Sequence, residues 1–470
     1  MLLPASLGLA VVSLPIPAGL TVNAWYYFAL FVTVIATLVT EPLPGPAAGL
    51  IGITAAAILR LVAPTPVESM QWALTGFADS TVWLMFVAFM FALGYQKTGL
   101  GRRLALLLVR SLGGRTLGLG YAIALTDLAL APFVPSNTAR SGGIVFPIIE
   151  GIPALYGSAP GATAHRIGAY VMWTAFATTC VTSSMFVTAL APNLLAVSLM
   201  NQIAGVQVTW VGWFLGFLPM GLVLFILQPF LIYRLCPPTV RMSAGVPKWA
   251  HQELVRLGPL TRRETMMALM ALLALSLWIF GGRWMTATAV ALLTLCLMVL
   301  SGVIAWDDFL GYRRAWSNLI WFATLITLAN GLSRVGFLPW FASTASGALG
   351  NLSSTATVSL LVVVFFVSHY LFASLTAHAT AMLPVFLTAI MVLPGLPVPL
   401  VSLLLSYSLG LMGILTPYAT GSAPLYYGSG YISHREFWML GLGFGALYLA
   451  TLLGVGLPYL ALLHSRHWLP

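Results

Sequence analysis

Charged side chains are scarce in this chain. They make up 6% of its 470 residues, whereas hydrophobic residues make up 60% and the mean hydropathy is +0.98. Soluble domains carry roughly 25% charged residues, so this scarcity excludes a chain whose surface is mostly solvated by water. Apolar stretches of about 20 residues recur, and each can cross a hydrocarbon layer about 30 Å thick. Because backbone groups in lipid need internal partners, we expect helices, and hence an all-α polytopic membrane protein.

Cysteine and the usual catalytic motifs are also lacking. The three cysteines, Cys180, Cys236 and Cys296, are too few and too scattered for a disulfide framework or a thiolate metal site. The only close histidine pair, His464 and His467, has no third ligand nearby. Neither a nucleophile elbow nor a phosphate-cradling loop occurs. We therefore expect no metal, no cofactor, no use of ATP and no enzymatic activity.

The apolar stretches predict about eleven membrane spans and two re-entrant hairpins. The hairpins, at about 117–150 and 355–392, carry polar clusters near their centres, so each is expected to enter the membrane and return on the same side. The predicted spans are 5–20, 24–40, 45–63, 81–97, 168–205, 211–235, 266–282, 286–304, 318–334, 397–428 and 437–462.

Basic residues indicate the orientation of the chain. With a cytoplasmic N-terminus, the predicted spans place most of the 20 basic residues on the cytoplasmic side, in agreement with the positive-inside rule. This distribution accounts for the net charge of +10 without a nucleic-acid partner. The proline-rich, charged segment 236–265 is interpreted as a cytoplasmic linker between a first half, 1–235, and a second half, 266–470. Equivalent points in the halves are separated by an odd number of crossings, which predicts an inverted repeat.

A short polar cluster lies at the centre of each predicted hairpin. Residues 136–140 read Ser-Asn-Thr-Ala-Arg, and residues 374–378, about half a chain later, read Ser-Leu-Thr-Ala-His. Prolines break the helix that enters the first cluster, and the free backbone donors of a broken helix, with hydroxyl and amide groups, suit a carboxylate or an inorganic oxyanion. Such a duplicated cluster favours a carrier with its site at the repeat interface. The simpler alternative is helix capping.

Two further polar stretches interrupt predicted spans. Residues 182–193 interrupt the fifth span and residues 416–424 interrupt the tenth, at similar distances after the two clusters. Unwound helices of this kind supply hydroxyls and carbonyls, and with the hairpin tips they would form two half-sites near the bilayer midplane. A simple proline kink is the alternative. The candidate binding residues are Ser136, Asn137, Thr138, Ser374, Thr376, Thr188, Thr420 and Gly421.

Arg140 and His378 occupy the same position in the two clusters. An arginine near the middle of a membrane is costly, and its expected role is to neutralise an anion. Histidine can also carry positive charge, but it titrates. The alternatives are a structural ion pair between Arg140 and Asp127, and a buried core histidine at His378.

Together these features resemble the divalent anion:sodium symporter family, part of the ion transporter superfamily. The resemblance rests on Glu-Pro-Leu-Pro at 41–44, Ser-Asn-Thr at 136–138, the cluster at 374–378 and Tyr-Tyr-Gly-Ser-Gly-Tyr at 426–431. It implies a homodimer in which a scaffold domain holds the dimer, while a transport domain carrying both hairpins moves as an elevator with a di- or tricarboxylate. It also implies that the first cluster binds one carboxylate through Asn137 and Thr138, and the second binds the other through Ser374 and Thr376.

The second cluster departs from the sodium-coupled pattern, because Leu375 replaces the asparagine of a second Ser-Asn-Thr. In this respect the chain is similar to the exchanger branch of the family, which includes bacterial citrate/succinate antiporters and plastid 2-oxoglutarate/malate translocators. This branch implies sodium-independent exchange of di- or tricarboxylates, with Arg140 and His378 standing where cations bind in symporters. We expect the membrane to be a bacterial inner membrane. The alternatives are a sodium-coupled dicarboxylate or sulfate symporter, and a non-transporting membrane scaffold.

Overall fold

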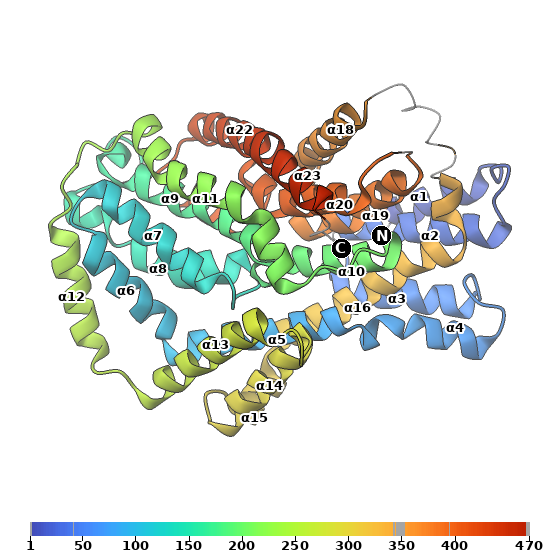
Figure 1. Cartoon of the computed structure of the whole chain (residues 1–470), viewed down its shortest axis with the longest axis horizontal. Coiled ribbons are helices and arrows are strands. Elements are labelled where there is room, and N and C mark those ends of the chain that lie inside the picture. The colour runs from blue at the N-terminus through green and yellow to red at the C-terminus, as the bar shows by residue number, and fades with distance from the viewer. Residues whose placement is uncertain (1, 41, 342–343, 345–352, 394, 467–470) are drawn as a thin grey trace.

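The computed structural model describes the chain except for residues 1, 41, 342–343, 345–352, 394 and 467–470. Every named element in this described part is a helix, as the composition predicts. Glu41, which contributes to the family resemblance, lies outside the described residues. Figure 1 shows α1–α4 at one end of the long axis and α6, α7, α9, α11 and α12 toward the other.

A helix lies in every predicted span. The first half contains α1 (Leu2–Ser13), α2 (Val22–Thr40), α3 (Gly45–Ile58), α4 (Pro66–Ala73), α5 (Ser80–Thr98), α6 (Leu100–Leu112), α7 (Thr116–Leu130), η2 (Thr138–Val145), α8 (Phe146–Ile149), α9 (Gly168–Met185), α10 (Ala191–Ala204) and α11 (Trp210–Leu235). The remainder contains α12 (Gly245–Leu257), α13 (Arg262–Phe280), α14 (Ala287–Leu300), α15 (Trp306–Gly311), α16 (Arg313–Arg334), α18 (Ser354–Val367), α19 (Leu375–Val392), α20 (Val398–Leu411), α21 (Ala423–Gly428), α22 (His434–Thr451) and α23 (Leu457–Ser465).

Fewer helices of the structure are long and apolar enough to cross a membrane than the number of spans predicted from the sequence. Within the described residues, five helices are long and apolar enough to cross a membrane, and two of them are the arms of the second predicted hairpin. The five are Trp210–Leu235, Arg262–Phe280, Ser354–Leu371, Leu375–Val392 and His434–Ser465. Other predicted spans contain shorter or interrupted apolar helices.

Helices α5 and α16 end in a similar way. Gly99 follows α5 with φ 75°, and Gly336 follows α16 closely with φ 80°. Both conformations are left-handed, and glycine adopts this region without the steric cost of a Cβ atom. Gly99 lies 37 residues before Ser136, and Gly336 lies 38 residues before Ser374, so the same backbone conformation precedes each polar cluster at a similar distance.

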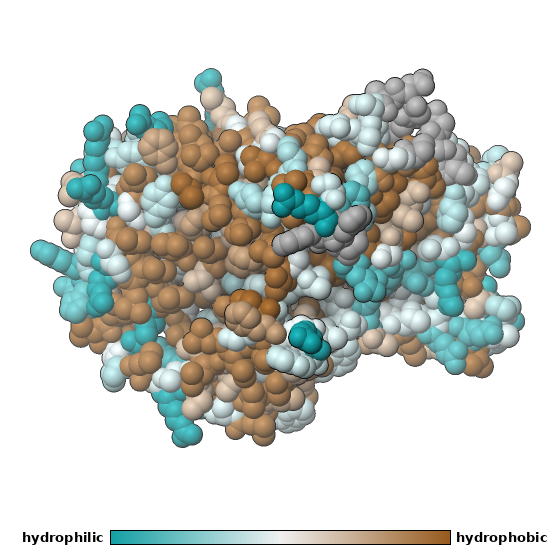
Figure 2. All heavy atoms as spheres, viewed as in Figure 1, coloured by the Kyte–Doolittle hydropathy of each residue, from teal (hydrophilic) through white to brown (hydrophobic). Residues whose placement is uncertain are grey.

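The outer surface is suited to lipid. Figure 2 shows apolar side chains over much of the face that carries α9, α11, α13 and α14. Contiguous apolar surface of this extent on a single chain requires an apolar surrounding. Exposed large side chains on α11 and α13 include Leu215, Leu222, Ile226, Phe230, Leu269, Leu272, Ile279 and Phe280.

The predicted linker contains a helix that is fixed to the first half. Helix α12 packs along α6. Ion pairs support this contact: Arg102 reaches Glu253 at 2.9 Å, and Arg103 reaches Glu264, just before the apolar part of α13, at 2.6 Å. The segment is therefore an ordered connection and not a free tether.

The buried side chains form two cores that share α16. A smaller core contains residues of α2, α3 and α4 with Leu325, Leu328 and Leu332 of α16. A larger core contains both predicted hairpins, α9, α10 and α20, together with other residues of α16 such as Leu319 and Phe322. Helix α16 therefore lies between the α2–α4 group and the elements that carry the polar clusters.

Candidate binding site at the hairpin tips

The two predicted hairpin tips meet at one cavity of about 230 Å³. It is lined by both polar clusters, by both helix interruptions, and by side chains of α5 and α16. The residues from the sequence prediction that line it are Ser136, Asn137, Thr138, Ser374, Thr376, Thr420 and Gly421. Segments from both halves of the chain therefore form a single site.

The first tip is built from a broken helix. Helix α7 ends at Leu130, and a new helical segment, η2, begins at Thr138, with Pro132 and Pro135 in the connection. Ser136 caps the new segment, because its Oγ accepts from the Ala139 N–H at 3.2 Å. The cap satisfies one of the backbone donors at the start of η2, and the first residue of η2, Thr138, lines the cavity.

The first tip is joined to the interruption in the second half. The Asn137 amide Nδ2 donates to Thr420 Oγ1 at 2.7 Å, and Asn137 is 5% exposed. The neighbouring Gly421 brings its backbone close to Thr138, since a Cβ atom at 421 would lie 2.3 Å from Thr138 Oγ1. Glycine at 421 therefore permits the Thr138 hydroxyl to remain at the cavity.

We expect Gly421→Ala to weaken substrate binding without unfolding the protein. The added methyl group must displace the Thr138 side chain, and loss of one well-placed hydrogen bond corresponds to roughly a 3- to 10-fold rise in KM. The matched control is Gly428→Ala, because nothing lies within 4 Å of a Cβ atom at that position, the last residue of the short helix α21 that follows Gly421. An unchanged KM for Gly421→Ala, measured in reconstituted vesicles, would contradict this role for Thr138.

The second tip presents the N-terminus of a long helix. Ser374 caps α19, and its Oγ accepts from the Ala377 N–H at 3.4 Å. Thr376 also lines the cavity, and its hydroxyl makes no hydrogen bond with another described residue. The positive end of the helix dipole and the uncommitted hydroxyl make this tip suitable for an anionic oxygen.

Helix α16 supplies a wall that the sequence prediction missed. Arg314, Asn318 and Trp321 line the cavity and are spaced by about one helical turn each, so they share one face of α16. Arg314 Nη2 donates to Ser136 Oγ at 3.1 Å. Their spacing is visible in the sequence, but only the packing of α16 shows that this face meets the hairpin tips.

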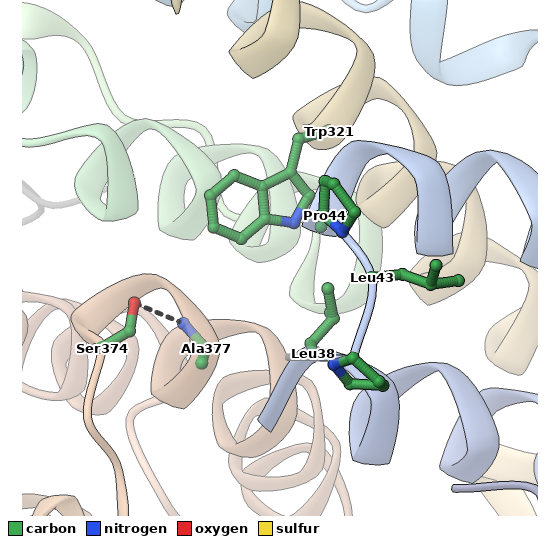
Figure 3. A pocket seen from close by; sticks show the side chains of 8 residues that line it. Leu38, Leu43, Pro44, Trp321, Ser374 and Ala377 are labelled. Carbon is green, nitrogen blue, oxygen red and sulfur yellow. Dashed lines mark hydrogen bonds between the residues drawn. The ribbon is translucent and has the colours of Figure 1, made fainter. Parts of the chain in front are cut away.

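A second hollow of about 480 Å³ adjoins the site and shares Trp321 and Ser374 with it. Figure 3 shows Trp321 across this hollow from Ser374 and Ala377 at the start of α19. Leu38 and Pro44 line its other side. The indole ring therefore forms a shared boundary between the polar cavity at the tips and a more apolar hollow beside α2 and α3.

Arg140 does not line the cavity, contrary to the expectation of a direct counter-charge. It is fully buried, and its Nε donates to Asp127 Oδ2 at 3.0 Å, which matches the structural alternative. Its Nη1 donates to the carbonyls of Val134 at 2.9 Å and Ala189 at 2.8 Å. Its Nη2 donates to the hydroxyls of Thr179, Thr182 and Ser183. The guanidinium therefore joins the first tip to the interruption between α9 and α10.

Thr188 also lies off the cavity. This buried residue donates from Oγ1 to the Pro132 carbonyl at 2.6 Å and accepts from Trp210 Nε1 at 3.1 Å. Its hydroxyl therefore fixes the first tip from the side away from the cavity, whereas the sequence predicted a contact between Thr188 and the ligand.

His378 is likewise absent from the cavity lining. Its Nε2 shares a hydrogen bond with Ser368 Oγ at 2.9 Å, and its ring packs near Phe365, Phe372 and His369. No described carboxylate forms an ion pair with it. The surroundings are those of a core histidine within the second hairpin, and they differ from the ion-paired surroundings of Arg140.

A tyrosine from the 426–431 segment supports the first tip. Tyr426, on α21, is buried, and its hydroxyl lies 2.6 Å from Ser141 Oγ in η2. Its ring also contacts Phe146 at the start of α8. The side chain therefore joins the returning arm of the first hairpin to the second half of the chain.

Comparison with known families and proteins agrees with this architecture. Residues 1–465 match the family described as the sodium:sulfate symporter transmembrane region. The citrate/succinate antiporter of Escherichia coli (strain K12) is 47% identical over 462 residues, covering 96% of this chain and 95% of that protein. The L-tartrate/succinate antiporter of the same strain is 44% identical over 460 residues, covering 95% of this chain and 94% of that protein.

A solved structure shares the fold at low sequence identity. The YdaH transporter of Alcanivorax borkumensis superposes with a TM-score of 0.58 at 16% identity, covering 84% of this chain and 89% of that chain. This likeness concerns the arrangement of helices alone.

Proposed function

The chain belongs to the sodium:sulfate symporter transmembrane-region family, and from this premise we propose that it exchanges di- or tricarboxylates across the membrane without sodium. The family predicted from four short segments of the sequence is thereby confirmed. The chain is an integral membrane transporter and not an enzyme. Its relatives named as citrate/succinate and tartrate/succinate antiporters support substrates of the same class.

The observation that carries the proposal is the convergence of two donor-bearing tips on one cavity. In the proposed complex, Asn137 and Thr138 bind one carboxylate, and Ser374 and Thr376 bind the other. Short helix-terminal segments with free hydroxyl and amide donors stabilise anionic oxygens without any metal. In this complex a linear dicarboxylate offers one charged end to each tip, whereas sulfate is a single compact oxyanion.

Exchange without sodium is proposed because protein groups take the place of coupling cations. Leu375 replaces the second-tip asparagine, and the guanidinium of Arg140, paired with Asp127, is fixed within the first hairpin. In this scheme Arg140 and His378 act indirectly, by fixing the tips where symporters hold cations. An arginine on the cavity wall, Arg314, adds a charge that remains when the site is empty. A positive charge left without an anion beside the moving tips is costly within the membrane, so return requires a substrate.

We also propose the membrane topology and the assembly of the protein, from its family membership and the pattern of its sequence. About eleven crossings and two re-entrant hairpins would form an inverted repeat of residues 1–235 and 266–470, joined by the linker at 236–265. A homodimer held through a scaffold, with both hairpins moving as an elevator, would carry the substrate between the two sides. The N-terminus would be cytoplasmic and the membrane the bacterial inner membrane.

Counterflow in proteoliposomes tests the proposed substrate class. Vesicles loaded with unlabelled succinate should take up labelled succinate, and external malate, 2-oxoglutarate, citrate or tartrate should compete at similar concentrations. Sulfate should not compete. Competition by sulfate alone would overturn the carboxylate assignment and favour the inorganic-anion alternative, and absence of any flux would favour a non-transporting scaffold.

A further inference from the structure

Arg314 is the only charged residue among those lining the cavity in the described part of the chain. Its exposed side chain extends from the first turn of α16 toward the first hairpin tip. One guanidinium nitrogen donates to Ser136 Oγ at 3.1 Å, and the guanidinium carbon lies 5.9 Å from the centre of the Phe89 ring. The charge is therefore held beside the tip residues by a hydrogen bond and an aromatic face.

No carboxylate of the described residues neutralises Arg314. The ion pairs of this part of the chain are formed by other residues, and the buried Arg140 is balanced by Asp127. Of the five N–H donors of the Arg314 guanidinium, one is used on Ser136, and no other hydrogen bond joins the group to a described residue. The cavity therefore carries net positive charge that comes from α16.

We propose that Arg314 is a substrate-binding residue, which pairs directly with the carboxylate held at the Ser136–Thr138 tip. Guanidinium and carboxylate form short, charge-assisted hydrogen bonds with matching planar geometry. Ser136 holds the guanidinium against the tip where that carboxylate is to bind. This assignment rests on the proposed carboxylate function. It adds the guanidinium of Arg314 as the group that binds the negative charge of the substrate.

The position of Arg314 makes the site a composite of two parts of the fold. The tips belong to the larger core, whereas α16 also anchors the smaller core of α2, α3 and α4 through Leu325, Leu328 and Leu332. Arg314 lies on the part of α16 that packs in the larger core, next to Ala315 and one turn from Leu319. The neutral donors therefore come from the hairpin tips and the cation from α16, and an anion bound between them contacts both.

Charge replacement at position 314 tests the assignment. In a Cys296→Ser background, which removes the exposed cysteine and leaves the buried Cys180 and Cys236, Arg314→Cys should raise the KM for succinate exchange by about 10- to 100-fold. Treatment with the cationic reagent 2-aminoethyl methanethiosulfonate should restore KM to within about 3-fold of the parent. Neutral methyl methanethiosulfonate should not restore it, and the anionic 2-sulfonatoethyl reagent should raise it further.

Arg313→Cys is the matched control, because the adjacent arginine is exposed and does not line the cavity. Its KM should be insensitive to all three reagents. Arg314→Lys is a second variant, which retains the charge and should keep KM within about 10-fold of the parent. Equal restoration by the neutral reagent, failure of the cationic reagent to restore, or an unchanged KM in Arg314→Cys would each overturn the assignment. Absence of exchange in the Cys296→Ser parent would instead contradict the proposed function itself.

Discussion

Replacing Arg140 with alanine is expected to destabilise the protein and abolish exchange together. The change removes hydrogen bonds to two carbonyls and three hydroxyls, and it leaves Asp127, which is 1% exposed, without its ionic partner. Breaking a buried ion pair on one side typically costs about 3–5 kcal/mol. The expected readout is a melting temperature well below that of the parent in detergent, together with loss of labelled succinate exchange.

The double variant Arg140→Ala, Asp127→Ala is the informative companion. Because it removes both charges, it should recover part of the melting temperature lost in Arg140→Ala, although exchange should remain impaired because the carbonyls of Val134 and Ala189 lose their common donor. A single Arg140→Ala variant that melts like the parent yet fails to bind substrate would contradict the structural role. Such a result would support the role suggested by the sequence, in which Arg140 directly neutralises the substrate anion.

Thr376→Ala is expected to cause a large loss of transport without destabilising the folded protein. Its hydroxyl has no partner among the described residues, so the folded state loses no internal hydrogen bond. A carboxylate oxygen at the second tip would lose a charge-assisted donor, which corresponds to about a 10- to 100-fold lower kcat/KM for exchange. The melting temperature without substrate should match that of the parent.

Two controls separate ligand binding from helix packing at this tip. Thr376→Ser keeps the hydroxyl and should retain most of the exchange activity. Thr380→Ala, one turn farther along α19, removes a hydroxyl that donates to the Thr376 carbonyl and does not line the cavity, so its KM should change little. If Thr376→Ala lowered stability as much as it lowered exchange, the second cluster would be a helix cap and not a binding site.

The hairpin tips could be predicted from the sequence because local chemistry specifies them. Prolines at 132 and 135 cannot continue a helix, and serine at 136 and at 374 is a preferred N-cap residue. The interruptions at residues 182–193 and 416–424 are visible for the same reason, and the structure places helix breaks there between α9 and α10 and between α20 and α21. Duplication of these local signals indicated which polar residues would converge.

The directions of the charged side chains could not be predicted in the same way. Arg140 and His378 are equivalent in sequence, but Asp127 lies beside the first, and aromatic rings surround the second. The position of Thr188 behind the first tip depends on contacts with Pro132 and Trp210 from other segments. The contribution of α16 was missed because a polar face on a helix does not reveal which element it meets. Tertiary packing, not local propensity, decided these cases.

The most direct measurement of the central claim is labelled succinate uptake into proteoliposomes of four kinds: empty or preloaded with unlabelled succinate, each with or without an inward sodium gradient. The account predicts rapid uptake into the preloaded vesicles, equal with and without sodium, and negligible uptake into the empty ones. Concentrative uptake into empty vesicles that depends on the sodium gradient would contradict it and establish a symporter.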